Sequence, residues 1–285
     1  MSAISKLKTF AGKTPVVRTL YDAVMKWGLS SYDTWQGEYV EFIAQRRGIS
    51  IDKARAMVDG AQKQFLGGWL GDDYRKFSEQ ALETFRPLHD DATDEAVIAT
   101  YKFHGPIDFL RMVGYVCPKP PEIEPIVSRL ASKSSVRIVD YGCGLAHRSL
   151  TVARALQAKG VKVHLTLVDI RKEYHALFLD FLCKKFGVPY DFIEITASAL
   201  YPELPEHDFC DNVSVLEHVR EPVTVVNNTH RALKPGGLFL AYCDDAIEEM
   251  MHISPDLSAV RKRLAELGYV KLTTVHSVPL FQKPS

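Results

Sequence analysis

The sequence lacks several features that point to particular classes of protein. Charge of one sign is not in excess, because 35 lysines and arginines balance 35 aspartates and glutamates over 285 residues. A net charge of zero creates no overall positive field, so we expect no nucleic-acid partner. No apolar run reaches the roughly 18 residues of a membrane span, and the N-terminus lacks the apolar core of a signal peptide. We therefore expect a soluble, cytoplasmic protein without a transmembrane segment.

Cysteine is also scarce and scattered. The five cysteines are odd in number and form no Cys-x-x-Cys pair; they are Cys117, Cys143, Cys183, Cys210 and Cys243. This pattern predicts free thiols rather than a disulfide framework, and it offers no zinc-binding pair. We accordingly expect no metal.

What is present favours a globular protein with two parts of different character. Apolar residues make up 46% of the chain, enough to bury a sizeable core. Residues 1–120 have helical patterns, whereas residues 121–285 alternate short β-branched runs with helical patterns. Three prolines in CPKPPE, residues 117–122, mark the boundary. We expect an all-helical N-terminal region over 1–120 and an α/β domain over 121–285.

Helical patterns in the N-terminal half predict a series of helices. Ser50 is a candidate N-cap for a helix through IDKARAMVDGAQKQFL, residues 51–66. Further helices are expected over 72–85, 94–103 and 106–115. Residues 1–30 are basic with interleaved apolar side chains. An ordinary solvated helix face is the favoured interpretation of this stretch, and weak contact with an anionic membrane or a lipid-linked substrate is the alternative.

The alternation of strand and helix patterns in the second half predicts a doubly wound, Rossmann-like sheet. Strands are expected over 136–141, 161–169, 192–196, 209–215, 238–243, 269–275 and 279–282, with helices over 122–132, 148–159, 172–186 and 222–233. The alternation favours parallel strands joined by right-handed crossovers. Only a tight turn separates the last two strands, so they form an antiparallel terminal hairpin. The result is a seven-stranded, mostly parallel sheet, with KPGG at 234–237 as a helix stop and turn.

The stretch VRIVDYGCGLAHRS, residues 136–149, indicates a cofactor site. Gly142 and Gly144 let the backbone pass close to a ligand at the carboxyl end of a strand. A nicotinamide fingerprint needs a third glycine where His147 stands. Asp140 would repel a pyrophosphate but could pair with an ammonium group, and Asp169 ends the next strand, where ribose hydroxyls are held.

Four motifs together carry a resemblance to a known family. VDYGCGLA, LVDI, HDFCDNVSVLEHVREP and HRALKPGGLFLAY occur in that order. Over about residues 122–285 the chain resembles the class I S-adenosylmethionine-dependent methyltransferases. The resemblance implies an α/β enzyme that binds S-adenosyl-L-methionine and transfers its methyl group.

The resemblance also implies positions for the cofactor. Asp140 would lie near the methionine amino group, Asp169 would hold the ribose, and Ile170 would lie beside the adenine. Ala197 and Ser198 stand where the family often has an aspartate facing the adenine amino group. The implied cofactor-binding residues are Asp140, Gly142, Cys143, Gly144, Asp169, Ile170, Ala197, Ser198, Asn212 and Val213, with Tyr101 reaching over from the helical half.

Catalysis could use Glu217, His218 or His147 as a base. The sulfonium methyl is already activated, so the protein mainly has to align the acceptor, and no metal is required. A base helps if the acceptor is a hydroxyl, because an alkoxide is scarce at neutral pH. The alternative for Glu217 and His218 is a structural role at a helix start.

Three hypotheses about function follow. The leading one is a methyltransferase for a small-molecule, glycan or lipid-linked acceptor, with the helical N-terminal region covering the site. The second is an enzyme that uses the adenosyl cofactor for another reaction, which the mass of the product would distinguish. The third is a non-catalytic scaffold, which weak cofactor affinity would favour. A dehydrogenase is disfavoured because of His147.

Overall fold

The computed structural model describes residues 37–58, 93–103, 120–245, 252–275 and 277–285. The chain divides into two compact units: Met1–Gln80 with Pro106–Val116, and Ala81–Gly105 with Cys117–Ser285. The helices expected over 72–85 and 106–115, the basic stretch 1–30 and Cys117 lie outside the described residues. Among the described residues, no helix has the length and apolarity needed to cross a membrane.

In the first unit, residues 37–47 and 51–58 are helical. The Ser50 hydroxyl accepts a hydrogen bond from the Lys53 backbone N–H at 3.3 Å. This bond satisfies one of the amide groups that lack a partner in the first turn of a helix. The predicted N-cap is confirmed, and Ala54 and Val58 are buried on one side of the helix that it begins.

The second unit contains a sheet and its covering helices. The order along the chain is α5 (Asp94–Phe103), α7 (Pro120–Leu130), β1 (Ser135–Tyr141), α8 (His147–Gln157), β2 (Lys162–Asp169), α9 (Glu173–Phe186), β3 (Tyr190–Glu194), β4 (His207–Asn212), the 3₁₀ turn η2 (Leu216–His218), α10 (Pro222–Ala232), β5 (Leu233–Ala241), α11 (Ser258–Glu266), β6 (Val270–Val275) and β7 (Val278–Gln282). The helix predicted over 94–103 is confirmed.

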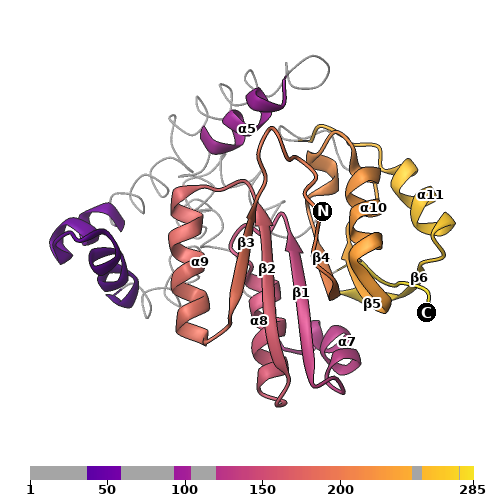
Figure 1. The fold of residues 1–285 in the computed structure, drawn as a ribbon, viewed down its shortest axis with the longest axis horizontal. Coiled ribbons are helices and arrows are strands. Elements are labelled where there is room, and N and C mark those ends of the chain that lie inside the picture. The colour runs from indigo at the N-terminus through magenta and orange to yellow at the C-terminus, as the bar shows by residue number, and fades with distance from the viewer. Residues whose placement is uncertain (1–36, 59–92, 104–119, 246–251, 276) are drawn as a thin grey trace, which may run out of the picture. The chain divides into compact units, whose positions relative to one another are not determined.

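The sheet has seven strands in the order β3-β2-β1-β4-β5-β7-β6. The strands β1 to β5 pair in parallel, and β7 pairs antiparallel with both β5 and β6. Figure 1 shows β3, β2, β1, β4 and β5 side by side. The predicted doubly wound sheet with an antiparallel hairpin is therefore confirmed. The chain order reverses between β1 and β4, which is where open parallel sheets bind ligands.

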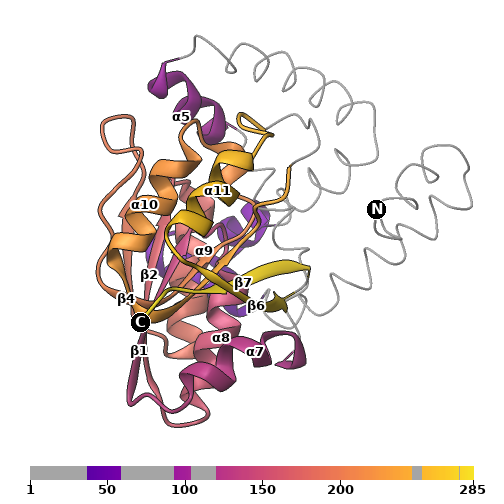
Figure 2. The same cartoon turned by 90° about the vertical axis from the view of Figure 1, so that its right-hand side faces the viewer.

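Helices cover both faces of this sheet. Right-handed crossovers place α8 and α10 on opposite faces, because β1-α8-β2 and β4-α10-β5 progress in opposite directions across the sheet; Figure 2 shows this arrangement from the side of β6 and β7. Burial on both sides explains why all six residues of β4 are buried. Four cysteines, Cys143, Cys183, Cys210 and Cys243, are buried free thiols, as predicted.

Some boundaries differ from the prediction. The helix α10 ends before KPGG, as predicted, but β5 already begins at Leu233 and includes these four residues. His207 of β4 pairs with Leu233 and Phe209 pairs with Leu238, so the residues of β5 between these two pairs form a bulge. Gly236 has φ +70°, which permits the extra residues to loop out of the ladder. The helix α11 was not predicted, because only Val260 and Leu264 of its nine residues are buried and the apolar periodicity is weak.

Candidate active site

The turn after β1 is held tightly against the neighbouring strands. The backbone N–H groups of Gly142 and Cys143 donate to the Val168 carbonyl at 2.7 and 3.2 Å. Gly142 has φ +70°, and a Cβ there would lie 2.4 Å from Cγ2 of Val215. Only glycine satisfies both conditions without strain. The turn after β1 and the segment after β4 are thus in direct contact.

Asp169 ends β2 and fastens this turn. One carboxylate oxygen accepts the Gly144 N–H at 2.7 Å, and the other accepts the Ile170 N–H at 2.6 Å. Each carboxylate oxygen has two acceptor positions, so the group can also accept hydrogen bonds from ribose hydroxyls. Asp169 is only partly buried. Its chemistry and its place beside the glycine turn fit the nucleoside part of S-adenosylmethionine.

Two buried carboxyls lie side by side at the ends of β1 and β4. Asp140 and Asp211 are register partners, and their residues are 6% and 2% exposed. Burial raises the pKa of Asp140 well above its usual value, and the Asp211 carboxyl raises it further. Burial also raises the pKa of Asp211, although Arg148 Nη1 donates to Asp211 Oδ1 at 2.7 Å and opposes the rise. Arg148 is thus the cation that acts on both carboxyls. A bound ammonium group would supply a second positive charge, so that both carboxyls could be ionised.

The residues expected near the adenine follow β3. The Ile195 N–H donates to the Asp169 carbonyl at 2.9 Å, which keeps this segment at the same edge as the ribose-binding candidate. Ala197 is partly buried and Ser198 is exposed. The Ser198 hydroxyl lies 3.1 Å from the Thr196 hydroxyl, and either oxygen can be the donor. Ser198 therefore offers a polar group where the family often has a carboxylate.

Asn212 and Val213 lie where β4 ends. Asn212 is fully buried, and neither polar atom of its side chain has a hydrogen-bond partner in the described part of the chain. Val213 is partly buried, and Ser214 after it has φ +59°. A non-glycine residue in this conformation is uncommon and turns the chain sharply. The turn brings Val215 against Gly142 and leads into η2.

The turn η2 presents two of the predicted catalytic residues. Nε2 of His218 lies 3.9 Å from Oε1 of Glu217. A third side chain joins them from a distant part of the sequence: the rings of His218 and His252 have centroids 4.8 Å apart at an interplanar angle of 62°. The Glu217 carbonyl accepts hydrogen bonds from the N–H groups of Ile253 and Ser254 at 2.8 and 2.9 Å. These two bonds fix His252 beside η2.

The helix α5 contributes Tyr101 to the same place. Its hydroxyl donates to the His218 carbonyl at 3.5 Å, and its ring meets that of His218 edge-on, with centroids 6.4 Å apart. Asp94 at the N-terminal end of α5 pairs with Arg220 at 3.3 Å, and Lys102 in its last turn pairs with Glu194 at 3.5 Å. The helix is therefore anchored to the last residue of β3 and to the segment that follows β4. Tyr101 lies beside the catalytic candidates.

His147 is placed differently from the other two catalytic candidates. It is the first residue of α8 and is partly buried, and its carbonyl accepts the Thr151 hydroxyl at 2.6 Å. The residues whose side-chain donor atoms gather after β4 are Glu217, His218 and His252, and His147 does not belong to this group.

Comparison with known proteins agrees with the fold and the motifs. The family model described as a methyltransferase domain matches residues 119–277. The chain belongs to this methyltransferase family. With the doubly wound sheet and its antiparallel hairpin, it is a class I S-adenosylmethionine-dependent methyltransferase, and the resemblance of the four motifs is confirmed.

The methyltransferase resembles curated relatives over part of their length. A ubiquinone biosynthesis O-methyltransferase of Pseudomonas putida is 30% identical over 122 residues, which are 41% of this chain and 49% of the relative. The enzyme of the same description from Ralstonia nicotianae is 32% identical over 122 residues, 41% and 48% of the two chains. The chain thus matches about half the length of these relatives. An O-methyltransferase family protein of Burkholderia thailandensis has 11% identity and a TM-score of 0.48, with 100% and 98% of the two chains covered.

Three residues of the candidate site could not be identified from sequence motifs. Arg148 and Asp211 form a pair only because β1 and β4 are neighbours in this register, and the sequence does not specify that register. His252 lies 34 residues after His218, and no spacing rule links the two. The sequence did contain one signal for Asp211. Residues two positions apart in a strand lie on the same face, so Asp211 could have been expected on the face of β4 that carries Phe209.

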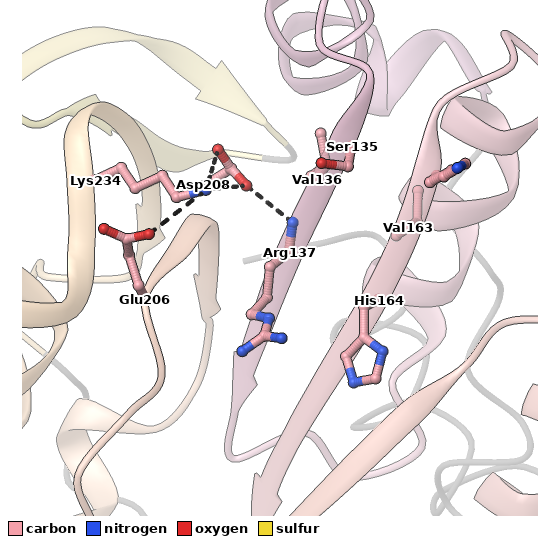
Figure 3. Close-up of a pocket in the computed structure, with 9 residues that line it drawn as sticks. Ser135, Val136, Arg137, Val163, His164, Glu206, Asp208 and Lys234 are labelled. Atoms are coloured by element: carbon pink, nitrogen blue, oxygen red, sulfur yellow. Dashed lines mark hydrogen bonds and ion pairs between the residues drawn. The ribbon is translucent and has the colours of Figure 1, made fainter.

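A depression lies at the opposite edge of the methyltransferase sheet, where the strands begin. It has a volume of about 430 Å³ and is lined by Ser135, Val136, Arg137, Lys162, Val163, His164, Glu206, Asp208 and Lys234. Figure 3 shows the Asp208 carboxylate between Lys234 and the backbone nitrogen of Arg137. Asp208 accepts from Lys133 Nζ at 2.7 Å and from the Arg137 N–H at 2.9 Å, and Lys234 Nζ lies 3.3 Å away. These contacts neutralise the buried carboxylate, so this edge has a structural role.

Proposed function

We propose that the chain transfers the methyl group of S-adenosylmethionine to a hydroxyl oxygen of a small-molecule acceptor. The observation that carries this proposal is the position of Glu217 and His218. They lie on η2, two and three residues after Val215, which contacts the glycine turn. Proton-accepting groups therefore lie next to the turn that would receive the methionine part of the cofactor. The relatives described as O-methyltransferases support an oxygen acceptor.

The cofactor-binding roles follow from the geometry at the carboxyl edge. Asp140 would pair with the cofactor ammonium, Asp169 with the ribose hydroxyls, and Ser198 with the adenine edge. The turn Gly142-Cys143-Gly144 would lie under the methionine part, with Ile170 and Ala197 along the adenine and Asn212 and Val213 near the sulfonium. Asn212 supports this arrangement because its buried amide has no partner in the described part of the chain, and buried amides are normally hydrogen-bonded.

The transfer requires little covalent chemistry from the protein. The bound cofactor supplies an electrophilic methyl group on a positively charged sulfur, and the acceptor oxygen displaces the sulfur while losing its proton. Glu217 or His218 would accept that proton. Glu217 is only 4% exposed, so water would compete little for it. Tyr101 would orient His218 through the hydrogen bond to its carbonyl.

The two regions of the chain would have separate tasks. Residues 121–285 would bind the cofactor, and the helical region 1–120 would cover the site and select the acceptor. Support for a covering role comes from α5, which belongs to the same compact unit as the sheet and brings Tyr101 to η2. Glycan and lipid-linked hydroxyls carry the same reactive group and belong in the same acceptor screen.

Calorimetry and product analysis test the proposal. We expect S-adenosylhomocysteine, but not NAD, to bind the purified chain. We then expect a ¹³C-methyl-labelled cofactor to yield an O-methyl signal by NMR with one of a panel of phenols, alcohols, glycans and lipid-linked alcohols. Amine acceptors serve as the matched comparison. A labelled N-methyl product would refute the oxygen acceptor, and no affinity for S-adenosylhomocysteine would refute the cofactor assignment.

A further inference from the structure

The cluster after β4 has the composition of a metal site. One carboxylate oxygen of Glu217 and one ring nitrogen from each of His218 and His252 all lie within 4.8 Å of one another. Two imidazoles and one carboxylate are a common ligand set for first-row transition metals, and they leave further coordination positions open. The cluster lies at the carboxyl edge of the sheet, where η2 follows the segment that contacts the glycine turn.

Glu217 gives independent evidence that a cation belongs here. The residue is 4% exposed, and its Oε2 is buried with no hydrogen-bond partner in the described part of the chain. Leaving a buried carboxylate oxygen unsatisfied costs free energy, which a coordinated cation would remove. One oxygen of the Glu217 carboxylate, Oε1, thus lies near the His218 ring, and the other, Oε2, has no partner among the described residues.

The backbone holds the three groups in place. Glu217 and His218 are adjacent in η2, and the Glu217 carbonyl accepts the N–H groups of both residues that follow His252. Ligands lie about 2.0–2.2 Å from a zinc-like ion, so donor atoms in such a site are about 3–3.5 Å apart. The present separations, all within 4.8 Å, would have to shorten to that range when an ion binds.

We propose that Glu217, His218 and His252 bind one divalent transition-metal ion. Two nitrogen donors favour an ion such as Zn²⁺ or Co²⁺ over Mg²⁺ or Ca²⁺, which prefer oxygen. With the ion bound, Glu217 and His218 would act as ligands instead of proton acceptors. The ion would bind the acceptor hydroxyl in an open position and lower its pKa, the proton would pass to solvent water, and the oxygen would attack the methyl carbon while the methyl–sulfur bond breaks. Metal binding itself is independent of the proposed function, whereas this catalytic role rests on it. This proposal departs from the expectation from sequence that no metal is involved.

Direct binding of Co²⁺ to the full chain tests the site. We expect equilibrium dialysis to give one tightly bound Co²⁺ per chain and the visible spectrum to show bands of a nitrogen- and oxygen-ligated ion. His252→Gln and His218→Gln should each weaken binding more than about 100-fold, since loss of a direct ligand exceeds the effect of losing an outer-shell partner. Glu217→Gln should weaken it as well.

Two controls separate the possible outcomes. His164→Gln, at the amino edge of the sheet and 33% exposed in its side chain, should bind Co²⁺ as the wild type does. S-adenosylhomocysteine affinity, measured on the same preparations, should be unchanged in His252→Gln, which shows that the variant is folded and tests the cofactor site separately. Wild-type chain without a stoichiometric Co²⁺, or His252→Gln with wild-type Co²⁺ affinity, would overturn the metal site.

Discussion

Asp140 of β1 lies directly opposite Asp211 of β4, and both carboxyls are buried at the carboxyl edge of the sheet. The pKa of Asp140 is raised by its burial and by the Asp211 carboxyl. The folded chain therefore retains a proton that the unfolded chain releases. Its stability falls as pH rises from the ordinary aspartate pKa to the raised one. A bound ammonium reverses this loss, because it favours the ionised form.

This relationship predicts a pH-dependent effect of the cofactor product. We expect S-adenosylhomocysteine to raise the melting temperature more at about pH 7 than at about pH 5, since Asp140 is ionised more fully at the higher pH. Differential scanning fluorimetry at several pH values measures the shift. Asp140→Asn is the control and should make the shift nearly independent of pH. Equal shifts at both pH values in the wild type would contradict the ammonium pairing.

Asp169→Ala should weaken S-adenosylhomocysteine binding. The carboxylate would lose its bonds to the ribose and its bond to the Gly144 N–H. We expect a loss of about 100-fold in affinity by calorimetry, because hydrogen bonds to a charged group contribute about 1.5–3 kcal/mol. Asp191→Ala is the matched control, since that carboxylate is 69% exposed and pairs with His164 at the opposite edge. A Kd in Asp169→Ala equal to that of Asp191→Ala would exclude a binding role.

Gly142→Ala should destabilise the fold more than an ordinary glycine substitution. A Cβ at Gly142 meets Val215 at 2.4 Å, whereas Gly160, also at positive φ, has open space. We expect urea unfolding to show a loss of about 3 kcal/mol for Gly142→Ala against about 1 kcal/mol for Gly160→Ala. Adding Val215→Ala to Gly142→Ala should recover part of the difference. Equal losses for the two glycines would mean that the contact with Val215 is unimportant.

Asp208→Asn should destabilise the sheet in a pH-dependent manner. Burial by itself raises the pKa of Asp208, but hydrogen bonds from Lys133 and the Arg137 N–H outweigh it, and the net pKa is lowered. The ionised group therefore contributes stability that is present above its unfolded pKa and lost as pH falls through the folded pKa. We expect a cost of about 3 kcal/mol at neutral pH that shrinks below about pH 4. Urea unfolding of Asp191→Asn provides the comparison, and a cost that does not vary with pH would contradict the charge pairing.

The parts of the fold that local patterns specify were predicted correctly. Short β-branched, apolar runs predicted all seven strands and the final hairpin, because parallel strands that are buried on both faces are apolar along most of their length. The glycine turn and Asp169 were assigned to one cofactor site from their motifs, and the structure joins them through the hydrogen bond from the Gly144 N–H to Asp169. Ser50 was recognised as a helix cap from its neighbours alone.

The parts that depend on long-range geometry were not predicted. Arg148 and Asp211 meet through strand register, and His252 reaches η2 through backbone bonds to Glu217. The sequence also could not show that β5 begins before KPGG, since the residues that loop out there are turn formers by composition. In each case the deciding contact joins segments that no periodic pattern relates.

The position of β7 constrains the order in which the sheet can assemble. β7 lies between β5 and β6, so β6 is joined to the sheet only through its pairing with β7 among the described strands. The turn between β6 and β7 is short, so this hairpin can close quickly, whereas the pairing of β7 with β5 joins residues about forty positions apart. Folding at this edge is therefore expected to proceed by docking of a preformed hairpin rather than by adding one strand after another.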